Sequence, residues 1–224
     1  MVVNKHGSFY MRSGWGTKII QAVEQDAMIF TPSSEQEAID NIGLGRVMIK
    51  ALRYWSDAMG LTHEEKEQGG IRLVPEPIYY SILNHDLYFQ RLGSLLLLHR
   101  NLALNEENAT AWYWLFNEWK QNVFTKDAFV DGFHSFLSVN GMKVKKTAVD
   151  KEFNCLKNTY IGEGKFDKNS IMDEDTYPFL APLQILKETG KNTYEKRSLT
   201  GKEVPLEILI YSIAMDNIDE SSSG

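Results

Sequence analysis

The chain has 224 residues, of which 43% are hydrophobic and 24% charged, and its formal net charge is −6 at pH 7. This size provides for one large or two small domains, and the acidic balance excludes a protein coated in basic residues, so any nucleic-acid surface must be a local patch. A single cysteine, Cys155, excludes an intramolecular disulfide, and no purely apolar run is long enough to span a bilayer. We expect a cytoplasmic protein with no membrane partner.

The first predicted element is a helix over residues 14–25, and a short segment rich in polar and aromatic residues precedes it. This segment contains His6, Tyr10 and Arg12, and Lys18 follows inside the helix. Side chains of these types crowded before a helix are typical of a site. The alternative is that the aromatic rings fill the core and Arg12 is solvated.

Residues 33–60 predict two short helices joined by a glycine turn. Serines at the start of this stretch are N-cap candidates, each followed three residues later by Gln or Glu, which is the capping-box spacing. Gly43 and Gly45 break the first helix, and Gly60 ends the second. The two helices share an apolar seam, as a helix-turn-helix requires. The seam consists of Ala38, Ile42, Leu44, Ile49 and Leu52.

The second of these helices carries a cationic stripe on the face opposite the seam. Arg46, Lys50 and Arg53 are spaced i, i+4 and i+7, so they lie on one side of the helix. A recognition helix needs this division, because one face packs on its domain while the other meets phosphates or base edges. The alternative is the solvated face of a plain helical hairpin.

The segment after this helix predicts a charged loop and then a short strand. Residues 62–70 are rich in Glu, and an apolar run follows from Ile71 to Val74 and ends at Pro75. A strand here would form the wing of a winged helix. We expect Arg72 to reach the DNA backbone from this wing.

The rest of the chain predicts a helical domain. Leucines on every face indicate a buried helix over residues 91–104, and the aromatic stripe over 112–119 is more typical of core packing than of a base-stacking platform. We expect a short helix over 177–188, a small β hairpin over 194–204 and a final helix over 206–215.

The predicted fold is therefore mainly α, with two domains. An N-terminal winged helix-turn-helix region (residues 1–77) packs on a C-terminal helical domain with a small β hairpin (residues 78–216). Residues 217–224 predict a disordered tail, because they are short, polar and acidic.

Candidate catalytic residues lie in two separate segments. His85 and Asp86 are an adjacent histidine–carboxylate pair, and such a pair can bind a metal or activate a water. His6 and Tyr10 are further candidates, because either side chain can act as a nucleophile. The hypothesis is that both segments meet beside the recognition helix, with Asp86 as a ligand for Mg²⁺ or Mn²⁺. The alternative is that His6 and Arg12 only tie the N-terminal segment to the core.

The sequence from His6 to Lys18, H-G-S-F-Y-M-R-S-G-W-G-T-K, resembles the opening pattern H-E-[ST]-F-x-x-R-x-G-W-L-x-K of a bacterial family of unknown function. This SspB-like family is encoded beside PAPS-reductase-like proteins in DNA phosphorothioation and phage-defence gene clusters. Three positions depart from its pattern, since Gly7 replaces Glu, Gly16 replaces Leu and Leu87 replaces Pro. Weaker family motifs match in order at Leu52–Trp55, Asp86–Tyr88, Ser94–His99, Glu174–Asp175 and Pro182–Leu183.

The resemblance implies a cytoplasmic DNA-binding component of a phosphorothioation or phage-defence system, with metal-dependent DNA nicking as one reading. The implied partners are DNA and other phosphorothioation proteins such as a PAPS-reductase-like sulfurtransferase, and the sequence is compatible with a homodimer. The alternative is a non-catalytic winged-helix regulator, or an assembly subunit that recruits a DNA-modification enzyme. The residues that we expect to contact DNA are Arg12, Lys18, Arg46, Lys50, Arg53 and Arg72.

Overall fold

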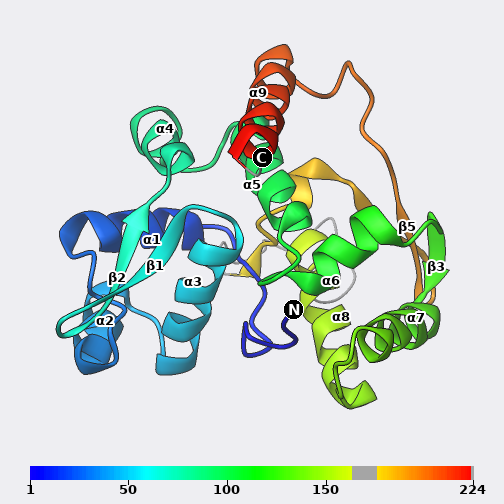
Figure 1. Cartoon of the computed structure of the whole chain (residues 1–224), viewed down its shortest axis with the longest axis horizontal. Helices are drawn as coiled ribbons and strands as arrows, with labels where there is room; N and C mark the ends of the chain where they lie inside the picture. Colours follow the sequence, from blue (N-terminus) through cyan, green and yellow to red (C-terminus); the bar gives the residue numbers. More distant parts are fainter. Residues whose placement is uncertain (163–175, 223–224) are drawn as a thin grey trace, which may run out of the picture.

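The computed structural model describes residues 1–162 and 176–222, with side chains described as far as residue 215. The described chain is mostly helical and contains a two-stranded and a three-stranded antiparallel sheet (Figure 1). The mainly α fold with a small β hairpin is therefore confirmed. The family motif at Glu174–Asp175 lies outside the described residues.

The first half of the chain, blue to cyan in Figure 1, forms helices and one hairpin. The predicted pair of helices joined by a glycine turn is confirmed, and Gly43 has a φ of 71°, a conformation that favours glycine. The elements are α1 (Trp15–Gln25), η1 (Pro32–Ser34), α2 (Glu35–Ile42), α3 (Arg46–Ala58), β1 (Thr62–Glu67), β2 (Gly70–Pro75) and α4 (Pro77–His85).

The apolar seam fixes α3 on the rest of this half. Ala38, Ile42, Ile49 and Leu52 are all buried, as the pattern predicted. Behind them the indole nitrogen of Trp55 donates a hydrogen bond of 2.9 Å to the carbonyl of Phe9. One side of α3 is thus held by the core while the opposite side faces outward.

The prediction of a charged loop over residues 62–70 is wrong, because most of it is the strand β1. Its backbone pairs in register from Thr62 with Pro75 to Glu67 with Gly70, and this pairing outweighs the low strand preference of its charged residues. The hairpin approaches the loop before α2 so closely that a Cβ on Gly70 would lie 2.1 Å from the methyl carbon of Thr31. The Thr31 hydroxyl both donates to and accepts from the backbone of Ile71, at 2.9 and 3.0 Å.

The second half contains the remaining helices and a sheet of order β3-β5-β4. Its elements are α5 (Leu92–Leu104), α6 (Thr110–Tyr113), the π-helical turn η2 (Trp114–Glu118), β3 (Val123–Thr125), α7 (Lys126–Val139), α8 (Lys146–Tyr160), η4 (Ala181–Leu183), β4 (Leu186–Gly190), β5 (Thr193–Lys196) and α9 (Leu206–Ser222).

Two local predictions in this half are wrong. The hairpin lies over residues 186–196, and its turn includes Asn192 at a φ of 55°, which asparagine tolerates. The predicted helix over 177–188 shortens to the 3₁₀ turn η4, because Pro178 and Pro182 have no N–H to donate. Helix α9 continues to Ser222, into the stretch for which we expected a disordered tail.

Buried side chains from both halves form one hydrophobic cluster that extends from Tyr10 to Tyr194. The N-terminal segment lies between the halves in Figure 1, and α9 lies against α5. The division at residue 77 remains a prediction. No helix within residues 1–162 and 176–222 is both long and apolar enough to cross a membrane.

Candidate nucleic-acid interface

The outer face of α3 presents the predicted cationic stripe. The side chains of Arg46 and Lys50 are 65% and 69% exposed, whereas that of Arg53 is only 27% exposed. The first two cations can therefore reach a ligand without any rearrangement of the core. Arg53 lies deeper, where α3 meets the hairpin.

Each cation of the stripe has an acidic partner that the sequence did not predict. Glu35, the first residue of α2, accepts from Arg46 Nε at 2.8 Å and lies 3.2 Å from Lys50 Nζ. Glu64 on β1 accepts two hydrogen bonds of 2.6 Å from the guanidinium of Arg53. Two cations share Glu35, so the exposed end of the stripe keeps an excess of positive charge.

The predicted wing is more acidic than a simple DNA-binding wing would be. Arg72 lies 3.2 Å from Glu67 within the same hairpin. His63 contacts Glu76 at 2.6 Å, and this hydrogen bond raises the pKa of the His63 imidazole. Arg72 is thus exposed but partly neutralised, and phosphate would have to displace Glu67 to reach it.

The predicted catalytic residues of the N-terminal segment are buried. His6 lies 3.1 Å from the buried carboxylate of Glu152 on α8, and its ring stacks near Trp55. The hydroxyl of Tyr10 donates to the carbonyl of Thr176. Both side chains hold the start of the chain against its second half. The contacts of His6 therefore agree with the alternative in which it only ties the N-terminal segment to the core.

Arg12 occupies a different environment from the stripe. Its guanidinium lies over the rings of Tyr10 and Trp15, at 5.1 and 5.5 Å from their centroids. Its Nε is buried, and none of the residues that the structure describes gives it a hydrogen-bond partner. An aromatic surround of this kind stabilises a cation without neutralising it.

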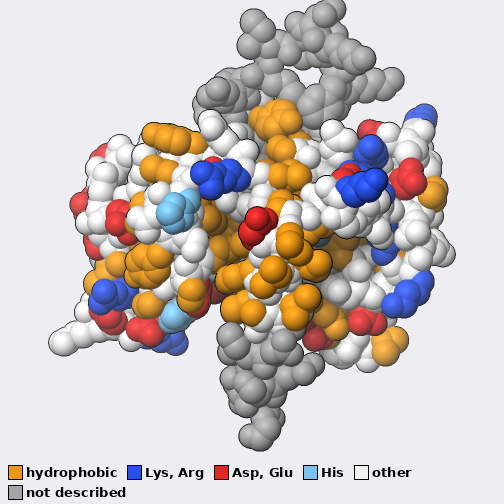
Figure 2. Space-filling model, turned by 90° about the horizontal axis from the view of Figure 1, so that it is seen from above, with side chains coloured by type: hydrophobic (Ala, Val, Ile, Leu, Met, Phe, Trp, Pro, Cys, Tyr) orange, Lys and Arg blue, Asp and Glu red, His pale blue; other side chains and the backbone are white. Residues whose placement is uncertain are grey.

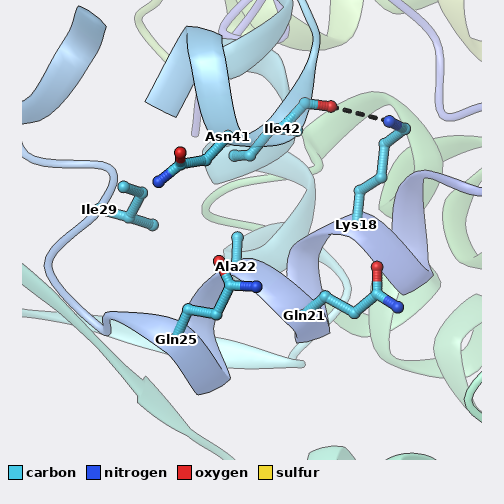
Figure 3. Close-up of a pocket in the computed structure, with 7 residues that line it drawn as sticks. All are labelled: Lys18, Gln21, Ala22, Gln25, Ile29, Asn41 and Ile42. Carbon is cyan, nitrogen blue, oxygen red and sulfur yellow. Dashed lines mark hydrogen bonds between the residues drawn. The ribbon is translucent and has the colours of Figure 1, made fainter. Parts of the chain in front are cut away.

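Lys18 faces the C-terminal end of α2. Figure 3 shows its ammonium donating a hydrogen bond of 2.8 Å to the carbonyl of Ile42, at one side of a small pocket between α1 and α2. The last carbonyls of a helix have no partner within the helix and carry partial negative charge. Lys18, which lies in α1, therefore caps the C-terminal end of α2. The position of Lys18 within its own helix did not predict this role.

His85 is the last residue of α4, and Asp86 directly follows it as the C-cap. The two carboxylate oxygens of Asp86 accept the backbone N–H groups of Gln90 and Arg91, at 2.9 and 3.0 Å. The next residue, Leu87, accepts a hydrogen bond from Thr17 on α1. This segment therefore meets the start of α1, whereas His6 contacts α3 and α8.

Magnesium prefers several oxygen ligands, including carboxylates, around one point. The Asp86 carboxylate is instead committed to two backbone N–H groups. Among the described residues, no group of three or more His, Cys, Asp or Glu side chains could hold a metal ion. The surroundings of Asp86 do not fit a magnesium site.

Comparisons with known proteins agree with the resemblance in the sequence. Two crystal structures, described as "Magnesium ion-bound SspB crystal structure" and "SspB crystal structure", match with TM-scores of 0.77 and 0.78 at 22% identity. Each match covers 93% of this chain and 63% of the SspB chain, and it shows a shared fold. No curated protein matches the sequence. The model of a family described as "Protein of unknown function (DUF4007)" matches residues 3–223, so the chain belongs to the DUF4007 family.

Proposed function

We propose that this protein is a DNA-binding component of a bacterial DNA phosphorothioation or phage-defence system. In this proposal α2, α3 and the β1–β2 hairpin act as a winged helix-turn-helix within residues 1–77, and residues 78–216 form the supporting domain. The structural likeness to SspB supports the link to phosphorothioation. DNA and a PAPS-reductase-like sulfurtransferase are the proposed partners.

The observation that carries the proposal is the exposed end of the α3 stripe. Arg46 and Lys50 share the single carboxylate of Glu35. Ion pairs between exposed side chains contribute only about 0–1 kcal/mol, so a DNA phosphate can replace the carboxylate at little cost. The opposite side of α3 is buried, which fixes the direction in which both cations point.

The test is the salt dependence of binding to a fluorescent DNA duplex. Each phosphate contact contributes about 0.9 to the slope of log affinity against log salt concentration. The double variant Arg46→Ala, Lys50→Ala should therefore lose about 2 units of slope. The matched control is Lys191→Ala, Lys202→Ala, which removes the same charge from exposed sites outside α3. Equal losses in both variants would reject the α3 face.

DNA nicking is a separate proposal that needs its own test. Supercoiled plasmid is incubated with the protein and Mg²⁺ or Mn²⁺, and wild type is compared with Asp86→Asn. Nicking that this substitution abolishes, with DNA affinity retained, would support a catalytic role for Asp86. Absence of nicking by the wild type with either metal would favour a binding subunit.

A second candidate function is an assembly subunit that brings a modification enzyme to DNA. Helix α9 exposes four large apolar side chains spaced i, i+3, i+4 and i+7, on the face seen in Figure 2. Exposed apolar faces of this kind favour protein partners or a homodimer. The side chains are Leu206, Leu209, Ile210 and Ile213.

The assembly function predicts that charge on α9 abolishes complex formation. Leu209→Glu, Ile213→Glu should prevent co-purification with the sulfurtransferase, or dissociate a homodimer in sedimentation velocity. Val139→Glu is the control, because Val139 is a large apolar residue exposed on α7. Unchanged assembly in the α9 variant would remove this face from the interface.

A further inference from the structure

A cavity of about 280 Å³ opens between α3 and the loop before α2, directly beside the cationic stripe. This volume is close to the lower end of the range of small-ligand pockets, about 300–1,000 Å³. The apolar part of its wall includes Phe30, Pro32 and Ile49. Thr31 fastens the same loop to the hairpin through two hydrogen bonds, so the wall is held in place.

The charged part of the wall consists of Glu35, Lys50 and Arg53. These side chains belong to the proposed DNA-contacting face, so the cavity and that face are continuous. Arg53 is held by two hydrogen bonds from its guanidinium to Glu64, which fix the plane of this group. A planar guanidinium fixed in this way can stack on an aromatic ring.

We propose that this cavity binds a nucleobase that is not paired within a duplex, with its phosphate on Lys50. The inference rests on the proposed DNA-binding function and adds the class of ligand. The apolar wall and the Arg53 plane would cover the faces of the ring, as occurs with bases splayed out of a helix. A free nucleotide has the same chemistry, and the experiment distinguishes the two sources.

The carboxylate of Glu35 adds a preference among bases. Carboxylates accept hydrogen bonds from the exocyclic amino group of cytosine. Thymine presents a carbonyl at the equivalent position, so two acceptors would face each other. We expect the cavity to favour cytosine over thymine by about tenfold, a typical value for one such contact.

The experiment measures the affinity of the whole protein for four fluorescent duplexes that differ at one position. They carry a matched pair, a bulged cytosine, a bulged thymine or a bulged abasic nucleotide. The proposal predicts tightest binding to the bulged cytosine, and affinity for the abasic duplex equal to or below that of the thymine duplex. Equal affinity for the three bulged duplexes would overturn it, because bending at a bulge would then explain any gain.

Two variants fill the cavity from different sides. Ile29→Phe enlarges a buried wall residue, and Pro32→Trp adds a ring from the exposed rim. Each should remove the cytosine preference while leaving affinity for the matched duplex unchanged. Ser33→Trp adds the same ring at an exposed neighbour outside the cavity and should keep the preference. Thermal unfolding identifies any variant that fails to fold, and retained preference in a folded cavity variant would reject the site.

A second arm separates this inference from the proposed function. Backbone amide chemical shifts are recorded during titration with dCMP, dTMP and inorganic phosphate. Shifts around the cavity with dCMP, absent with phosphate alone, would support a base site even if the protein bound no duplex. Failure of duplex binding alone would reject the proposed function. Absence of both the dCMP shifts and the cytosine preference would reject the base site.

Discussion

The guanidinium of Arg53 and the carboxylate of Glu64 form two hydrogen bonds of 2.6 Å that join α3 to β1. Because this pair neutralises Arg53, we predict that Glu64→Gln strengthens DNA binding. The released cation can contact one further phosphate, so the slope of log affinity against log salt concentration should steepen by about 0.9.

Glu65→Gln provides the matched control for this prediction. It removes the same charge from the adjacent residue of β1, whose side chain points to the opposite face of the strand. Its nearest ionic partner is His63, at 3.4 Å. If both substitutions changed the slope equally, net charge would explain the effect and Arg53 would not be a phosphate contact.

Lys18 provides a test of capping against DNA contact. Lys18→Met keeps the aliphatic stem but removes the hydrogen bond to the Ile42 carbonyl. We expect a loss of about 1 kcal/mol in unfolding free energy, which lowers Tm by about 2–4 °C for a protein of this size. Lys18→Arg should retain most of the stability. Unchanged Tm with weaker DNA binding would instead support the predicted phosphate contact.

The buried pair of His6 and Glu152 should be important for folding. His6 Nδ1 accepts the N–H of Ser8, so Nε2 carries the proton that faces the carboxylate. Glu152→Ala leaves the buried Nε2–H group of His6 without its acceptor, which costs about 1–3 kcal/mol, and we expect this loss in urea unfolding. Glu152→Gln should lose less, because its amide oxygen can still accept. Exposed Glu107→Ala is the control, and an equal loss there would contradict the argument.

Local signals explain why the helix pair could be predicted from sequence. The apolar seam, the serines before α2 and the glycine turn act within a few residues of one another. The strand β1 could not be predicted in the same way, because its charged residues become a strand only by pairing with β2. The hairpin of β4 and β5 was displaced for a similar reason, since its register depends on β3 as well.

The sequence predicted where the cations of the candidate site lie on α3, but it did not predict the acidic side chains that neutralise them. The spacing of Arg46, Lys50 and Arg53 placed them on one face, and periodicity alone sufficed for that. Their partners Glu35 and Glu64 lie on neighbouring elements, so the neutralisation depends on tertiary packing. The cavity likewise combines α3 with a loop of no regular pattern, which no spacing rule identifies.

The final prediction concerns stability in acid. Burial lowers the pKa of His99 to about 4 from an ordinary value of 6.5, and a hydrogen bond of 2.9 Å joins its Nδ1 to the Tyr160 hydroxyl. Between these two values the unfolded chain binds a proton that the folded chain does not. Stability from this residue is therefore present above pH 6.5 and falls as the pH is lowered towards 4, at up to about 1.4 kcal/mol per pH unit.

His99→Gln keeps a hydrogen-bond acceptor for Tyr160 but cannot titrate in this range. The difference in unfolding free energy between wild type and variant should therefore shrink as the pH falls from 7 to 4, measured by urea unfolding at each pH. Other titrating groups are common to both proteins and cancel in this difference. A constant difference across the range would mean that His99 is protonated as readily in the folded chain as in the unfolded chain, and would contradict its burial as the cause.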